Sequence, residues 1–252
     1  MKSIQVLAWG SFLLFVATVS MADETVRMTN SWSGSLSGGA NITRGNSETM
    51  LYNGSALMEY KMTRHEFRIG AEVNYGENVV VQTNGARATQ SNVDNAKCYA
   101  KYKWLFLGNA YLYGQFDLSR DDIAVIEYRL LVGPGLGFYL VKNDQNKLAL
   151  EGGCSYLREK KSGIEDDKIT LRLAQRYDLK LSETAKAWES IEYLPSFEDF
   201  ADYLLNTEIG IETSISSAFS LKLTVQNKFN SRPAVEKKNS DLTAIASVNY
   251  KF

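Results

Sequence analysis

The chain has 252 residues and a formal net charge of −1 at pH 7, so it lacks the basic surplus typical of nucleic-acid-binding proteins. It contains 3 prolines against 18 glycines, 14 tyrosines and 11 phenylalanines. This composition favours strands and turns over helices.

The first 22 residues have the pattern of an export signal. Lys2 supplies a positive start, residues 4–19 are largely apolar, and Ser20 and Ala22 are small residues ahead of a cleavage site before Asp23. No later run is long and apolar enough for a transmembrane helix. The sequence therefore predicts a signal peptide over 1–22 and one exported domain over 23–252.

Apolar and polar residues alternate along the rest of the chain, as in strands with one apolar face. In the last segment the even-numbered residues from Leu242 to Phe252 are apolar, and Ile245 is the exception on the other face. About twelve segments follow this pattern, each near the ~9–11 residues that a tilted strand needs to cross a bilayer. They lie near 30–42, 49–61, 65–75, 96–106, 110–119, 127–141, 147–158, 168–180, 187–197, 202–214, 218–230 and 241–252.

The connections between these segments alternate in kind. Long or charged connections are expected at 76–95, 120–126, 159–167, 198–201 and 231–240, with the short turn at 44–47 as an exception. Brief connections are expected near 61–64, 108–109, 143–146, 182–186 and 216–217. Short periplasmic turns and long outer loops produce this alternation, with both termini in the periplasm.

These patterns predict an all-β fold, a closed antiparallel transmembrane β-barrel of about twelve strands with up-and-down topology, in the outer membrane of a Gram-negative cell. A sheet that spans lipid has to close, because unpaired backbone groups are costly there. The slightly negative mean hydropathy of −0.25 fits alternating lipid-facing and inward-facing residues. A secreted β-sandwich is the alternative.

Pro134 lies within the sixth segment, where proline removes a ladder donor, so we expect a bulge or bend there. Gly133, Gly135 and Gly137 share the inward face. They are expected either to leave space or to admit a neighbouring side chain.

Three stretches, SWSGSLSGGANITRGNSET, GPGLGFYL and LALEGGCSYLRE, resemble the YdiY-like family of salt-induced outer-membrane proteins, a domain of unknown function. The resemblance runs over most of the mature chain. It implies an outer-membrane barrel and assigns no reaction and no catalytic residue. The stretch 76–95 departs from it, and its role is open.

Cysteine and histidine give little sign of a reactive site. Cys98 and Cys154 fall on the lipid-facing side of the fourth and seventh strands, which are not neighbours, so two free thiols are expected rather than a disulfide. His65, the one histidine, begins the third strand on the outward face and is expected to be structural or interfacial. We therefore expect no metal, no cofactor and no enzymatic activity.

Charges of both signs fall on the inward face. The expected lumen-lining residues are Arg68, Glu72, Lys101, Lys103, Asp117, Arg129, Glu151, Arg172, Arg176, Glu208, Glu212 and Lys222. They either line an aqueous channel or pair across the interior and close it. An eight-stranded barrel is already just filled by side chains, so about twelve strands favour a channel.

The sequence thus predicts a narrow porin-like channel with a mixed-charge polar lumen. The alternative is a closed structural or stress-response barrel that acts through its outer loops. Expected partners are outer-membrane lipids, the barrel-assembly machinery through the closing strand that ends on Phe252, and small solutes or ions, with no nucleic acid.

Overall fold

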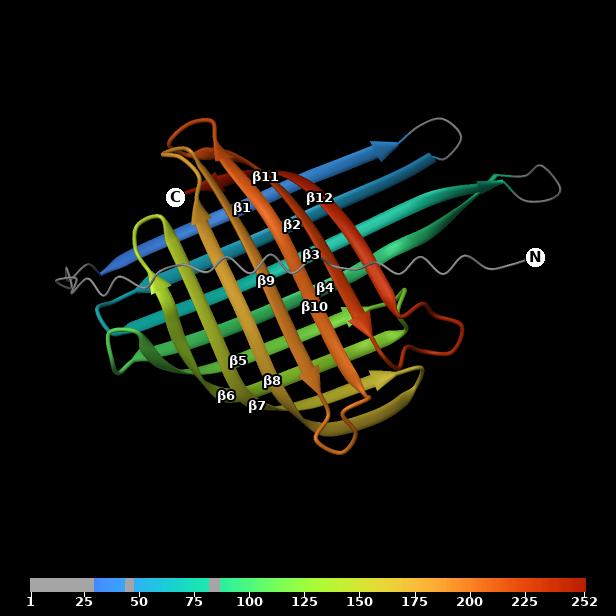
Figure 1. Ribbon diagram of the computed structural model, residues 1–252. Helices are drawn as coiled ribbons and strands as arrows, with labels where there is room; N and C mark the ends of the chain where they lie inside the picture. Colours follow the sequence, from blue (N-terminus) through green and yellow to red (C-terminus); the bar gives the residue numbers. More distant parts are fainter. Residues whose placement is uncertain (1–29, 44–47, 82–86) are drawn as a thin grey trace, which may run out of the picture.

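The computed structural model describes residues 30–43, 48–81 and 87–252. The predicted signal peptide and the 44–47 turn lie outside them. Within the described residues, twelve strands form a closed barrel in which each strand pairs antiparallel with its sequence neighbours and β12 pairs with β1 (Figure 1). The strands are β1 (Ser31–Thr43), β2 (Glu48–Lys61), β3 (His65–Val81), β4 (Arg87–Leu105), β5 (Ala110–Asp121), β6 (Ile126–Lys142), β7 (Asn146–Lys161), β8 (Ile164–Lys180), β9 (Ala185–Pro195), β10 (Tyr203–Ser214), β11 (Phe219–Asn230) and β12 (Ser240–Lys251). The predicted all-β, up-and-down barrel is confirmed.

The barrel has two distinct ends. At the terminal end, where β1 begins and β12 finishes, the connections are 62–64, 106–109, 143–145, 181–184 and 215–218. At the opposite, distal end the described connections are 122–125, 162–163, 196–202 and 231–239. In the described part of the chain, no helix is long and apolar enough to cross a membrane.

The expected long connections at 76–95 and 159–167 are wrong, because strands continue through both stretches. β3 continues to Val81, and β4 already begins at Arg87. Their pairing has a register shift at Gly76/Glu77. β7 and β8 pair up to a two-residue turn at Ser162 and Gly163, where both residues have positive φ. Outward charges pair across this rim, as between Arg158 and Glu165 at 2.7 Å, so charge here marks a solvated strand end. The expected connections at 120–126, 198–201 and 231–240 become 122–125, 196–202 and 231–239.

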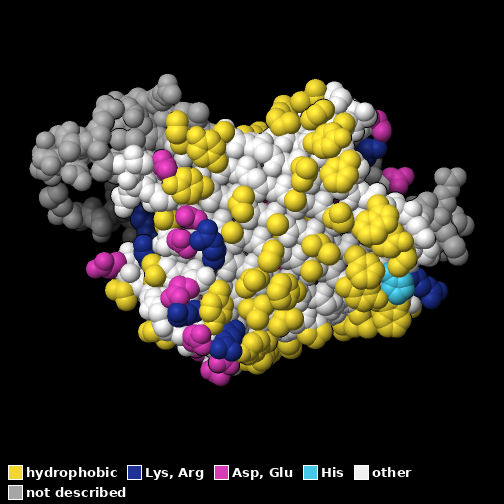
Figure 2. Space-filling model, turned by 180° about the vertical axis from the view of Figure 1, so that it is seen from behind, with side chains coloured by type: hydrophobic (Ala, Val, Ile, Leu, Met, Phe, Trp, Pro, Cys, Tyr) yellow, Lys and Arg dark blue, Asp and Glu magenta, His cyan; other side chains and the backbone are white. Residues whose placement is uncertain are grey.

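The outer surface divides into an apolar region and a charged rim. Figure 2 shows hydrophobic side chains over the wall, with Lys, Arg, Asp and Glu gathered mainly at one end. Aromatic rings meet near the terminal end, including Trp32 on Tyr60 with centroids 4.3 Å apart. This arrangement is that of a barrel with an apolar band and an interfacial aromatic girdle.

The ladder continues past Pro134 without a shift of register, so the expected bulge there is wrong. Pro134 lies opposite Gly114 of β5. On its other side the β6–β7 partners pass from Val132–Tyr156 to Gly135–Gly153 in the same register. The irregularities of this ladder lie at Ile126/Tyr128 and Tyr139/Val141. A local gap in the ladder absorbs the missing N–H.

The closing seam is short. Register partners between β1 and β12 run only from Ser35–Lys251 to Gly38–Val248. Next to them Gly34 and Phe252 exchange main-chain hydrogen bonds of 2.8 and 3.0 Å. The barrel is therefore closed most firmly at its terminal end.

Candidate functional site

Alternation along the strands directs one set of side chains into the barrel, where residues of non-adjacent strands meet. The centre of this interior is Glu151 of β7, whose side chain is only 8% exposed. Its carboxylate contacts Lys101 Nζ of β4 and accepts hydrogen bonds from Arg172 Nη1 at 2.8 Å and Tyr111 Oη at 2.8 Å. Lys103 Nζ lies 3.5 Å away. Four donors from three other strands thus converge on one carboxylate.

Arg172 of β8 extends this group, which we call the Glu151 cluster, across the sheet. Its Nε donates to Glu192 of β9 at 2.6 Å, and its Nη1 donates to Tyr113 Oη at 2.9 Å. Glu192 also accepts a hydrogen bond of 3.1 Å from Asn206 of β10. The cluster therefore braces one wall of the barrel from β4 to β10.

The inward glycines make room for the tyrosines of this wall. A Cβ on Gly135 would lie 2.3 Å from Tyr113 Cζ, and one on Gly137 would lie 2.2 Å from Tyr111 Cζ. The glycines therefore admit neighbouring side chains, the second of the two expected outcomes. Tyr111, Tyr113 and Tyr139 are 0%, 3% and 2% exposed. Sequence reasoning missed them as inward residues, although Tyr111 and Tyr113 alternate with the outward Leu112.

The opposite wall carries small polar side chains. β1 contributes Ser33, Ser35 and Ser37, and Ser37 donates a 2.8 Å hydrogen bond to Asn249 of β12. Charged side chains that face the space between the two walls keep much of their surface open. Arg68, Lys97 and Asp178 are 42%, 40% and 40% exposed. The interior thus holds a packed cluster on one wall and solvated charges beside it.

The other predicted lining residues are distributed along the interior. Asp117 pairs with Lys97 at 2.8 Å, Arg129 with Glu159 at 2.7 Å, and Arg176 with Asp178 at 2.8 Å. Among the predicted lining cations, Lys101, Lys103 and Arg172 share Glu151, whereas Arg129 and Arg176 have carboxylates of their own.

Three further lining residues lie on β10 and β11, and one lies on β3. Glu208 accepts hydrogen bonds from Trp188 Nε1 at 2.5 Å and Gln226 at 2.9 Å. Lys222 lies over the Trp188 ring at 5.3 Å. Glu212 contacts Lys186 and Lys251 at 3.1 and 2.5 Å. Glu72 faces Lys97 in the β3–β4 register.

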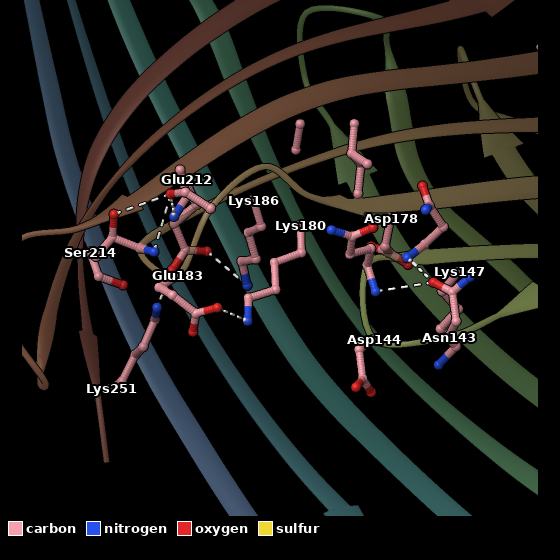
Figure 3. Close-up of a pocket in the computed structure, with 17 residues that line it drawn as sticks. Asn143, Asp144, Lys147, Asp178, Lys180, Glu183, Lys186, Glu212, Ser214 and Lys251 are labelled. Atoms are coloured by element: carbon pink, nitrogen blue, oxygen red, sulfur yellow. Dashed lines mark hydrogen bonds and ion pairs between the residues drawn. The ribbon is translucent and has the colours of Figure 1, made fainter. Parts of the chain in front are cut away.

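A cavity of about 440 Å³ opens at the terminal end. Figure 3 shows Lys186 and Lys251 directed at Glu212 on one side and Lys180 paired with Glu183 nearby. Asp178, Lys147 and Asn143 form the other side of this mouth. Its wall carries both charge signs.

A second cavity, of about 320 Å³, lies in the distal half of the interior. Its polar lining includes Lys97, Asp117 and Arg129, and Pro233 and Ala234 of the 231–239 connection also line it. Leu131, Leu194 and Leu204 add an apolar side. The prediction of a polar lumen did not anticipate this apolar patch.

Residues suited to covalent or metal chemistry lie away from the interior. Cys98 and Cys154 are free and exposed, as expected. His65 Nδ1 lies 2.8 Å from Tyr102 Oη at the outer surface. Across the described ranges, no group of three or more His, Cys, Asp or Glu side chains is placed to hold a metal ion.

The family described as "Protein of unknown function, DUF481" matches residues 37–252. The chain belongs to the DUF481 family. This is the YdiY-like family of outer-membrane proteins, so the predicted resemblance is confirmed. A search of the curated proteins finds none that matches this DUF481 chain.

Solved outer-membrane barrels share the fold at low sequence identity. An outer membrane channel from Pseudomonas putida F1 is 12% identical with a TM-score of 0.50, covering 93% of this chain and 99% of that one. The KdgM porin is 12% identical with a TM-score of 0.48, over 88% and 99% of the two chains. The NanC porin is 7% identical with a TM-score of 0.49, over 87% and 97%. At 12% identity, the likeness to the Pseudomonas putida channel shows the fold of this DUF481 protein alone, that of an outer-membrane barrel.

Proposed function

We propose that this DUF481 protein is a narrow, passive channel of the outer membrane. The observation that carries the proposal is the solvated charge of the interior: inward Arg68, Lys97 and Asp178 keep about two fifths of their surface open. The Glu151 cluster fills part of the interior beside these charges and narrows the passage. Cavities at the terminal and distal ends lie on either side of this constriction.

The chemistry of the passage suits small hydrophilic solutes and ions. Paired charges of both signs line it, so fixed charge is largely compensated along its length. We expect weak ion selectivity. The channel proposal is tested by recording currents across a planar bilayer that contains the refolded barrel: discrete steps support it, and a folded barrel without steps contradicts it.

The proposed orientation places the terminal end in the periplasm. Short turns at that end, the two longer connections 196–202 and 231–239 at the other, and the charged distal rim support this direction. A signal peptide over 1–22 and recognition of the closing strand by the barrel-assembly machinery belong to the same proposal.

A closed structural barrel is the second candidate. The convergence of Lys101, Lys103 and Arg172 on Glu151 favours it, because such a network can plug an interior. Induction by salt, which the family resemblance implies, is compatible with either function.

A further inference from the structure

The two strands that close the barrel separate towards its distal end. Their register partners stop at Gly38 and Val248. Beyond this point, residues 39–43 of β1 pair with β2 alone, and residues 240–247 of β12 pair with β11 alone, within the described part of the chain. Figure 1 shows the red β12 turning away from the blue β1 in this half of the barrel.

Two free strand edges therefore face each other across the seam. The two strands still touch at Gly39, since a Cβ there would lie 2.1 Å from Ala246 O, so the free edges begin beyond this pair. Unpaired backbone groups are costly in hydrocarbon unless they border water or protein. An opening with water on its inner side meets that condition.

The distal cavity borders β12, one of the two strands with a free edge. Asp241 of β12 and Lys228 of β11 belong to its lining. Ile245, the apolar residue that breaks the alternation of β12, faces inward beside the free edge, and Leu242 on the outer face is 73% exposed. Apolar side chains thus lie on both faces of β12 along its free edge.

The charges of the cavity define the head group that fits it. Six charged side chains of its lining form no ion pair within the described residues. They are three lysines and three carboxylates: Lys228, Lys237, Lys238, Asp121, Asp241 and Glu236. Equal numbers of both signs suit a head group without net charge. The apolar patch suits a short tail.

We propose that the distal half of the β1–β12 seam is a lateral opening, through which a small single-chain amphiphile without net charge passes between the outer leaflet and the distal cavity. The assignment of the opening to the outer leaflet rests on the proposed orientation of the barrel. The lateral route does not require current through the lumen, so its failure and that of the channel proposal are separable.

The first test measures the separation of the strands by cross-linking in lipid vesicles. In a Cys98→Ser, Cys154→Ser background, Ile42→Cys with Ala244→Cys would be register partners if the ladder continued beyond the contact at Gly39. Leu36→Cys with Tyr250→Cys, which are register partners, is the matched control. We expect the control to form a disulfide at least an order of magnitude faster, because a disulfide needs its Cα atoms within about 7 Å. Equal rates would overturn the proposal, as would Ile42→Cys or Ala244→Cys alone linking two copies.

The second test uses N-octylmaleimide dissolved in the bilayer and a sulfonated, water-soluble maleimide. Leu204→Cys reports on the cavity, and Ser190→Cys, inward on β9 but outside the cavity lining, is the control. At each position we compare the labelling rate of the octyl reagent with that of the sulfonated one. We expect this ratio to be an order of magnitude higher at Leu204→Cys than at Ser190→Cys. An equal ratio at the two positions would overturn lateral access. Heat-modifiable gel mobility confirms that every variant is folded.

Discussion

The ring of the terminal Phe252 lies over the backbone of Gly34. A Cβ at Gly34 would lie within 2.5 Å of Phe252 Cζ, and the main chains of the two residues exchange hydrogen bonds of 2.8 and 3.0 Å. Phe252 thus packs on β1 and fixes the point at which the pairing between β1 and β12 begins.

We expect Gly34→Val to weaken this closure. The new side chain would displace the Phe252 ring, and overpacking of this kind costs about 1–3 kcal/mol. Gly38→Val is the matched control, because it lies on the same strand and face and a Cβ there meets nothing within 4 Å. The measurement is urea unfolding in detergent; equal midpoints for the two variants would contradict the role of this contact.

We expect Gly137→Ala to disturb the packed wall. A Cβ there would meet the Tyr111 ring at 2.2 Å and push the Tyr111 hydroxyl away from Glu151, at a cost of about 1–3 kcal/mol. Gly114→Ala on β5 has nothing within 4 Å and should unfold like the parent. A Gly137→Ala barrel of unchanged stability would mean that the tyrosine does not need the space above this glycine.

Glu151→Gln should be more damaging than either glycine substitution. It leaves Lys101, Lys103 and Arg172 without their shared carboxylate, and breaking a buried ion pair from one side costs about 3–5 kcal/mol. Adding Lys101→Met removes one uncompensated charge and should restore part of the loss. Additive destabilisation in the double variant would show that Lys101 and Glu151 are not coupled.

A pH-sensitive contact holds two distal connections together. The Ala201 amide donates to Asp199 at 2.9 Å, and Arg232 of the 231–239 connection contacts the same carboxylate. Both hold the pKa of Asp199 below its usual range. A depressed pKa in the folded state means that this contact is present above the unfolded pKa and is lost as the pH falls through the lowered value.

Asp199→Asn should therefore imitate acid at neutral pH and loosen the 231–239 connection. We expect faster tryptic cleavage after Lys237 or Lys238 in the folded barrel. Glu198→Gln, an exposed neighbour, should cleave like the parent. Identical digestion of all three proteins would exclude Asp199 as a tether of this connection.

Alternation in the sequence was sufficient to predict the strands, the closure of the barrel and the outward position of Cys98 and Cys154. It was insufficient to predict the loop lengths. In the sequence the charged ends of β7 and β8 resemble loops, and only the structure shows the ion pairs that join them across the strands. The Glu151 cluster could be predicted as inward charge but not as a cluster. Lys101 and Glu151 lie on strands that are not neighbours, and only the curvature of the closed barrel brings them together.

The most direct test of the proposed channel is single-channel recording of the refolded barrel in a planar bilayer, together with a matched pair of variants on β2. Ser55→Trp adds a large side chain to the solvated inner wall, whereas Ala56→Trp adds the same side chain to the lipid-facing surface. We predict discrete, salt-dependent steps for the parent, the same steps for Ala56→Trp, and much smaller ones for Ser55→Trp. A correctly folded parent without steps, or equal steps for both variants, would contradict a water-filled passage along this wall.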